Sequence, residues 1–107
     1  MDPIGRLLSE PPDLPVVGGL AALSAALESR GVAVVQAPPG TGKTTMVPPA
    51  VAATVTGRVV VTQPRRIAAR AAARRLASLL GEPVGATVGY SVRGDTVVSP
   101  DTRIEFV

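Results

Sequence analysis

One lysine occurs in the 107 residues of this chain, and it lies within residues 37–44, Ala-Pro-Pro-Gly-Thr-Gly-Lys-Thr. The other ten basic residues are arginines. A lysine kept at one place suggests chemistry that arginine cannot do, because the ammonium is a compact point charge. The segment fits the pattern G-x-x-x-x-G-K-[ST], with Ala37 in place of the first glycine. We therefore expect Lys43 to hold the β- and γ-phosphates of a nucleotide.

The residues on both sides of Lys43 suit a phosphate site. Gly40 and Gly42 allow backbone N–H groups to approach phosphate oxygens closely, and a following helix adds the positive end of its dipole. The Thr44 hydroxyl is the expected Mg²⁺ ligand, so the catalytic roles are assigned to Lys43 and Thr44. The alternative is a chance match in a loop rich in glycine and proline. A predicted strand before the motif and a predicted helix after it argue against chance.

The elements that position this loop are predicted from hydrophobic periodicity and from glycine and proline positions. The expected elements are an extended lead-in over 1–13, helices over 18–30, 44–55 and 64–80, and strands over 32–36, 58–62, 85–92 and 103–107. Strands that alternate with helices predict an α/β fold with a parallel sheet. The strand over 32–36 is a short β-branched run, which predicts a buried strand.

Composition limits the classes of protein to consider. The chain has 46% hydrophobic residues and a net charge of +3, which fits one small globular domain. It has no cysteine and no histidine, so disulfides, Cys or His metal sites and a histidine general base are excluded. No apolar run is long enough for a membrane span, and the N-terminus lacks a signal-peptide pattern. A cytoplasmic protein is the default expectation.

Basic residues are concentrated in the third predicted helix. Five of the eleven lie between Arg65 and Arg75 with no acid among them, which indicates a polyanion partner. Arg66, Arg70 and Arg74 form a stripe in which like charges repel. Either an anion binds near this stripe or solvent screens it, and for Arg70 and Arg74 a solvated face is an equal alternative. The predicted buried face of the same helix consists of Ala68, Ala69, Ala72, Leu76, Leu79 and Leu80.

Arg65 and Arg66 stand apart from the rest of that helix. They follow Pro64 at the helix start, just past the C-terminal end of a predicted strand, where open parallel sheets bind ligands. Cations at a helix N-terminus oppose the dipole, so the placement is unfavourable without a partner. We expect their target to be a phosphodiester backbone.

Several segments, in order, resemble the DEAH-box RNA helicases. Residues 62–69, Thr-Gln-Pro-Arg-Arg-Ile-Ala-Ala, look like motif Ia of that family. Residues 88–93 resemble its Val-Gly-Tyr-x-x-Arg segment, and residues 102–107 resemble the strand that leads into motif Ib. Residues 14–16 and 36–40 are most similar to a bacterial HrpB-type branch. The resemblance extends from Leu14 to Val107.

The resemblance implies an ATP-driven, 3′-to-5′ RNA helicase built from two RecA-like domains. Arg75 matches an arginine that stacks on adenine, although a solvated helix-end arginine is the alternative. Arg65, Arg66 and Arg93 match positions near the backbone of single-stranded RNA. The implied nucleotide-binding residues, with ATP and Mg²⁺ as cofactors, are Pro39, Gly40, Thr41, Gly42, Lys43, Thr44, Thr45 and Arg75.

The resemblance also implies which parts lie beyond Val107. These are the Asp-Glu-x-His motif, the Ser-Ala-Thr motif and the second domain. Residues 14–107 would form the N-terminal part of the first RecA-like domain, able to bind nucleotide weakly at best and unable to turn over ATP. We also expect self-association through an exposed sheet edge. The alternatives are another P-loop ATPase or nucleotide kinase without a nucleic-acid role, and a structural remnant that binds neither ligand.

Overall fold

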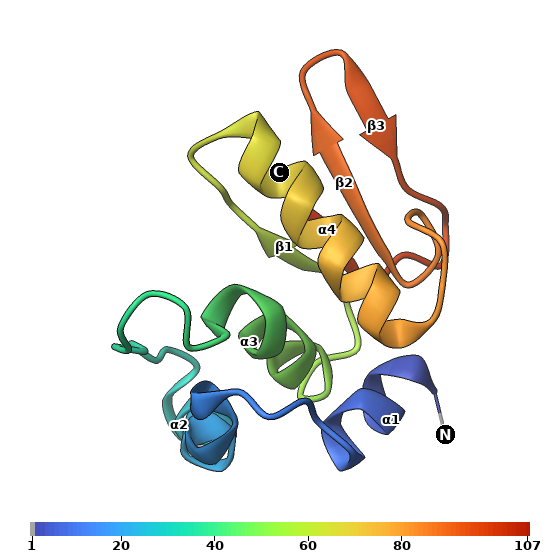
Figure 1. Cartoon of the computed structure of the whole chain (residues 1–107). Helices are drawn as coiled ribbons and strands as arrows, with labels where there is room; N and C mark the ends of the chain where they lie inside the picture. Colours follow the sequence, from blue (N-terminus) through green and yellow to red (C-terminus); the bar gives the residue numbers. More distant parts are fainter. Residues whose placement is uncertain (1) are drawn as a thin grey trace.

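A computed structural model describes residues 2–107, and Met1 lies outside the described part. Its elements are α1 (Pro3–Ser9), the 3₁₀ helix η1 (Pro15–Gly19), α2 (Leu20–Arg30), α3 (Lys43–Ala52), β1 (Val59–Val61), α4 (Arg66–Leu80), β2 (Val88–Val92), β3 (Asp95–Val97) and β4 (Ile104–Phe106). Helix α4 lies across the sheet, α1 and α3 pack against α4, and α2 packs against α3 on the side away from α4 (Figure 1). Within residues 2–107, no helix is long and apolar enough to cross a membrane.

The four strands form one mixed sheet in the order β1-β4-β2-β3. Strands β1, β4 and β2 are parallel, as predicted, and Ile104 is in register with both Val59 and Val88. Strand β3 pairs antiparallel with β2 and was not predicted. The two strands are joined by a tight turn in which Gly94 has a φ of 83°, a conformation that favours glycine. Arg-Gly is a weaker hairpin signal than Asn-Gly or Asp-Gly, so this turn could not be predicted from its residues alone.

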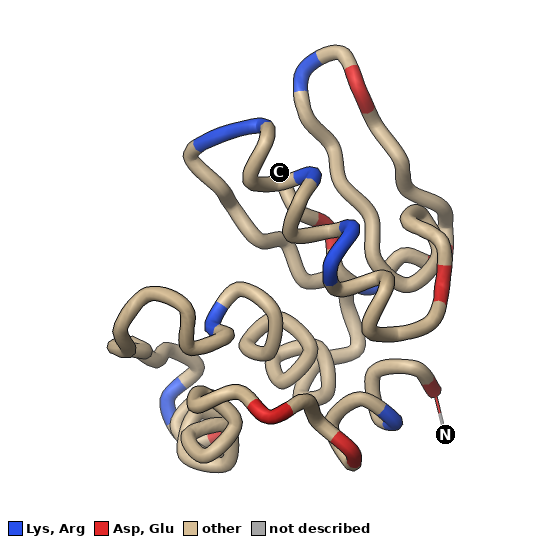
Figure 2. The backbone as a smooth tube through the Cα atoms, in the orientation of Figure 1, with Lys and Arg blue, Asp and Glu red and all other residues tan. Residues whose placement is uncertain are grey.

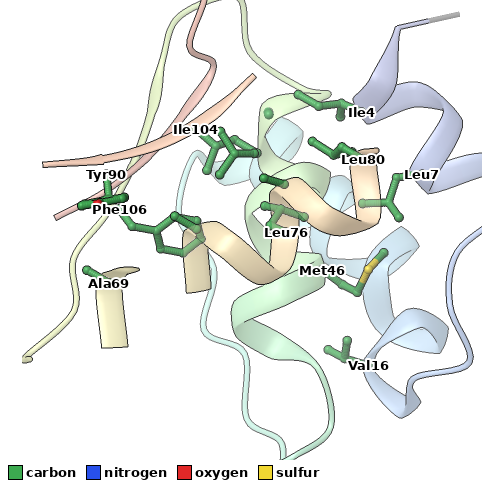
Figure 3. Packing of buried hydrophobic residues seen from close by; sticks show 14 residues of the cluster. Ile4, Leu7, Val16, Met46, Ala69, Leu76, Leu80, Tyr90, Ile104 and Phe106 are labelled. Atoms are coloured by element: carbon green, nitrogen blue, oxygen red, sulfur yellow. The ribbon is translucent and has the colours of Figure 1, made fainter. Parts of the chain in front are cut away.

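The core lies between α4 and the sheet face that it covers. Alternate residues of the parallel strands point to this face, so that Ile104 and Phe106 are fully buried while Glu105 points away. These side chains pack with Leu76 of α4 and Tyr90 of β2 in one cluster (Figure 3). Helix and sheet are therefore held together by the burial of large side chains.

The buried face of α4 differs from the prediction in its rotation about the helix axis. Ala69, Leu76 and Leu80 are buried as expected, but Leu79 is 38% exposed. The structure buries Ala73 and Ala77 in its place. Helices α1 and α3 also pack against α4, and their apolar side chains join the cluster that contains the two alanines. The covered side of the helix is consequently set by three neighbours rather than by the sheet alone.

The extended lead-in predicted over residues 1–13 is wrong, because α1 forms there. The Asp2 carboxylate accepts a hydrogen bond of 2.6 Å from the Gly5 N–H and so caps the helix. Pro3 occupies the first turn, where a missing N–H costs little. Ile4 and Leu7 then turn one face into the core. The helix is only two turns long, which is too short for its periodicity to be recognised among the prolines.

The buried strand predicted over residues 32–36 is also wrong. Helix α2 ends as expected at Gly31, which has a φ of 73°. The residues after it adopt neither helix nor strand, and Val32 and Val34 are 72% and 85% exposed. A strand requires a neighbour that accepts its backbone hydrogen bonds, and within residues 2–107 no strand pairs with this segment. The β-branched composition is present, but its pairing partner is not.

Candidate functional site

The loop over residues 37–42, which follows the unpaired segment 32–36, is shaped by two glycines. Gly40 and Gly42 have φ values of 81° and 98°, in the left-handed region. The Gly42 carbonyl accepts hydrogen bonds from the N–H groups of Thr45 and Met46 and so starts α3. Within the described residues, the N–H groups of residues 40–44 donate to no recorded acceptor. The loop thus presents a run of unpaired donors at a helix N-terminus, which is a favourable arrangement for an anion.

The Lys43 side chain folds back across this loop. Its Nζ donates a hydrogen bond of 2.5 Å to the Ala37 carbonyl, and the contact is partly buried. The ammonium is therefore held over the same turn that exposes the backbone N–H groups. Ala37 contributes only its backbone carbonyl to this contact. Every residue type has that group, so the contact does not require glycine at position 37.

The 3₁₀ helix η1 and the residue before it contact the loop and help to hold it in place. The Val16 N–H donates to the Thr41 carbonyl at 3.0 Å, and the Thr41 hydroxyl donates to the Pro38 carbonyl at 2.8 Å. Leu14 lies directly against Gly42, because a Cβ at that glycine would be 2.8 Å from Leu14 Cδ1. Sequence reasoning gave Leu14 no part in the site. The sequence signal that could have pointed to Leu14 is that it lies in the segment 14–16, which resembles the DEAH-box helicases.

A hollow of about 450 Å³ lies beside the loop. Its volume is within the range of small-molecule sites. The residues that line it are Leu14, Pro39, Gly40, Gly42, Lys43, Thr44, Thr45 and Arg75. The structure thus brings together every residue that the sequence assigned to the nucleotide except Thr41, whose carbonyl accepts from Val16 of η1 and whose hydroxyl donates to the Pro38 carbonyl. No described carboxylate lines the hollow.

Arg75 reaches this hollow from a different element. It lies on α4, and its Nε donates to the hydroxyl of Thr45 on α3 at 3.3 Å. The distance is slightly longer than the usual N–H···O range of about 2.7–3.2 Å, so this hydrogen bond is a weak one. This contact joins the two helices that form opposite walls of the hollow.

The residues assigned to RNA lie elsewhere. Arg65 is the exposed N-cap residue of α4. A terminal nitrogen of Arg66 lies 3.5 Å from the carbonyl of Arg93, which brings the start of α4 next to the β2–β3 turn. Figure 2 shows basic residues along α4 and at this turn. None of the three arginines lines the hollow beside the phosphate loop.

Arg70 is compensated by an acid that sequence reasoning did not connect with it. Its Nε lies 3.2 Å from Asp95 Oδ2 in an ion pair, although the atoms are not aligned for a hydrogen bond. The Tyr90 hydroxyl donates to the same carboxylate oxygen at 2.8 Å. Asp95 belongs to the unpredicted strand β3, so the partner of Arg70 could not be found without the hairpin. Arg70, Arg74 and Asp95 line one hollow of about 360 Å³ on this side of α4.

Glu105 lies on the sheet face opposite α4. A hydrogen bond from the Ser91 side chain lowers the pKa of its carboxyl, and the Arg58 guanidinium lowers it further against the opposing effect of burial. Arg58 reaches Glu105 at 2.9 Å and also donates to the Ser99 and Thr102 carbonyls. This network ties β4 to neighbouring segments and is separate from both candidate sites.

Comparison with known proteins gives a consistent assignment. No protein-family model matches the chain. The ATP-dependent RNA helicase HrpB of Escherichia coli K12 is 43% identical over 96 residues, which are 88% of this chain and 12% of that protein. The human ATP-dependent RNA helicase DHX33 is 39% identical over 97 residues, 88% of this chain and 14% of that protein.

Solved structures agree with these relatives. The crystal structure of the Escherichia coli DEAH/RHA helicase HrpB superposes with a TM-score of 0.83 at 42% identity, over 89% of this chain and 12% of that one. The fold is thus an incomplete α/β domain of the RecA-like helicase type. The chain belongs to the DEAH-box helicases of the HrpB type, and it spans about an eighth of the relatives it matches.

Proposed function

We propose that residues 14–107 form the N-terminal, phosphate-binding part of the first RecA-like domain of an ATP-dependent RNA helicase. In the parent protein, ATP hydrolysis would drive 3′-to-5′ movement along single-stranded RNA, in the cytoplasm. The observation that carries this proposal is the hollow in which the glycine loop, Lys43 and Arg75 meet. Relatives at about 40% identity that are named ATP-dependent RNA helicases support it.

The nucleotide would enter with its phosphates against the loop. The unpaired N–H groups of residues 40–44 and the positive end of α3 would stabilise the phosphate charge. Lys43 would exchange its bond to the Ala37 carbonyl for phosphate oxygens, and the Thr44 hydroxyl would ligate Mg²⁺. The bound ion would neutralise charge on the β- and γ-phosphates.

The residues of this chain support binding of ATP but not its hydrolysis. The described lining of the hollow includes cations and hydroxyls but no carboxylate that could orient an attacking water. The 107-residue chain should therefore bind ATP weakly and not hydrolyse it. The RNA would contact Arg65, Arg66 and Arg93 through its phosphates, which predicts binding that is independent of sequence and sensitive to salt.

Titration of the chain with Mg·ATP tests the nucleotide site. Lys43→Ala should weaken binding about tenfold or more, because a charge-assisted hydrogen bond contributes about 1.5–3 kcal/mol. Arg30→Ala is the matched control, since it removes an exposed cation at the end of α2. Equal affinity of wild type and Lys43→Ala would contradict the assignment, as would ATP turnover that depends on Lys43.

Titration with a single-stranded RNA oligonucleotide tests the second site. The double variant Arg65→Ala plus Arg66→Ala should weaken binding. It should also reduce the slope of log K against the logarithm of salt concentration by about two units at most. ATP binding combined with RNA affinity that is unchanged by the double variant would favour a P-loop ATPase or kinase without a nucleic-acid role.

A further inference from the structure

The hollow contains a side-chain contact that phosphate binding does not explain. Thr45 is the second residue after Lys43 and is only 8% exposed, yet its hydroxyl faces α4 closely enough to accept from Arg75 Nε. Arg75 is exposed as a whole residue, although its contact with Thr45 is partly buried. A buried residue of α3 therefore holds one edge of the guanidinium of an exposed residue on α4.

This contact restricts a side chain that would otherwise be mobile. An exposed arginine has many rotamers, and ordering it costs conformational entropy. Within residues 2–107, Arg75 has no ion pair, and its terminal nitrogens have no recorded hydrogen-bond acceptor. The bond from Nε to Thr45 is thus the polar contact that fixes the guanidinium in this part of the chain, and its terminal nitrogens are left without a protein partner in a residue that lines the hollow.

The two walls of the hollow offer different chemistry to a ligand. The loop wall presents backbone N–H groups and the Lys43 ammonium, both suited to phosphate oxygens. The α4 wall presents a planar guanidinium, which also packs against flat rings. A nucleotide that places its phosphates on the first wall directs its sugar and base away from the loop, toward other surfaces of the same hollow.

We infer that Thr45 is a positioning residue, which holds Arg75 in place for the part of the nucleotide beyond the phosphates. A hydroxyl can accept two hydrogen bonds and donate one, so accepting from Arg75 leaves its own proton free. The inference rests on the proposed function, because it places a nucleotide in this hollow. It gives the Thr45 hydroxyl a task different from the direct nucleotide contact that the family resemblance implies.

The prediction concerns the ratio of two affinities. Thr45→Val retains the shape of the side chain but removes the acceptor, which frees Arg75. The affinity for Mg·ATP should fall about threefold to tenfold relative to that for Mg·tripolyphosphate, the loss of one neutral-acceptor hydrogen bond. Thr45→Ser, which keeps the hydroxyl, should retain the wild-type ratio.

The experiment is a double-mutant cycle measured by calorimetric titration with both ligands. In an Arg75→Ala background, Thr45→Val should leave the ratio unchanged, because the arginine that it positions is already absent. If Thr45→Val lowers the unfolding temperature, Arg75→Lys is used as the test variant in its place. Lysine keeps the charge but has no N–H at the Nε position. Arg75→Lys should then lower the ratio by a similar factor.

The outcomes separate this inference from the proposed function. A wild-type ratio in Thr45→Val, with both ligands bound normally, would overturn the positioning role and leave the nucleotide site intact. An equal loss for ATP and tripolyphosphate, persisting without Arg75, would overturn it too by showing that Thr45 acts on the phosphates. Failure of the wild type to bind either ligand would refute the proposed function and the inference together.

Discussion

The two walls of the candidate nucleotide site are held by different forces. Helix α4 packs on the sheet through side chains that are fully buried, among them Leu76 and Phe106. The segment over residues 32–42, which leads into and forms the phosphate loop, is held by a few local contacts, chiefly the Val16–Thr41 hydrogen bond and the Lys43–Ala37 hydrogen bond. One wall depends on burial of apolar area and the other on individual polar contacts.

This difference follows from what each wall has to do. A loop that offers its N–H groups to a ligand cannot use them for internal hydrogen bonds, so it gains little stability of its own. A helix that carries a side chain to the same site can bury its opposite face and remain rigid. Substitutions should therefore affect global stability on the α4 side and local geometry on the loop side.

The largest expected effect is on the packed side. Phe106→Ala removes a fully buried ring and should lower the free energy of unfolding by about 3–5 kcal/mol, enough to unfold a marginal domain. Val34→Ala, on the loop side, should change it by less than about 0.5 kcal/mol because Val34 is already exposed. Urea denaturation measures both values. Similar losses in the two variants would show that the loop segment belongs to the cooperative core.

A smaller effect is expected within the loop itself. Gly40→Ala meets no neighbouring atom and should cost about 1–2 kcal/mol for its positive φ alone. Gly42→Ala has the same conformational cost and also meets Leu14, so we expect about 2–3 kcal/mol. Adding Leu14→Ala should recover part of the steric cost and none of the conformational cost, because it removes Leu14 Cδ1 but keeps a Cβ that lies 3.0 Å from the new methyl. Equal effects of the two glycine substitutions in urea denaturation would mean that Leu14 does not press on the loop.

The unpaired segment also predicts self-association. Its β-branched residues and free backbone groups can pair with a second copy, as the exposed edge strand β1 also can. Val34→Lys should raise the dissociation constant of the dimer by up to about fivefold, since a cross-strand pair contributes about 1 kcal/mol at most. Sedimentation equilibrium measures it, with Leu79→Lys as a control on α4. An equal change in the control would contradict an edge at residues 32–36.

The smallest effect concerns the sheet face opposite α4. Because the pKa of Glu105 is lowered in the folded state, its contribution to stability is present above the ordinary glutamate pKa of 4.5 and is lost as the pH falls through the lower folded-state value. Ser91→Ala should reduce this loss, because the hydrogen bond from Ser91 is the largest single cause of the lowered pKa of Glu105. The size is about 1 kcal/mol or less, because the Arg58–Glu105 pair is partly exposed to solvent. Urea denaturation at pH 7 and pH 3 measures it. Glu28→Gln serves as the control.

The parts of the fold that were predicted correctly depend on local signals. The start and end of α4 follow from Pro64 and Gly81, and the three parallel strands follow from β-branched runs between turns. The residues of the phosphate loop could be named because the motif fixes their spacing, and the structure gathers them around one hollow. Arg75 was named only through the family resemblance, since a helix-end arginine carries no signal by itself.

The errors arise where structure depends on distant partners. The run over residues 32–36 has the composition of a strand but no strand beside it, and local propensity cannot supply a neighbour. The burial of Ala73 and the ion pair of Arg70 with Asp95 depend on how α1, α3 and the hairpin meet α4. The Thr45–Arg75 contact joins residues that are 30 positions apart, and only the packing of α3 against α4 brings it about.

Helix α4 has a further, mechanical consequence. It begins at Arg66, beside the hairpin turn, and carries Arg75 to the hollow, so the two cations are separated by about 13 Å of continuous helix. A packed helix of this length behaves as a stiff rod on the scale of small displacements. Arg66 and Arg75 therefore keep a fixed spacing along the helix axis, and neither can shift along that axis unless the whole packed helix shifts with it.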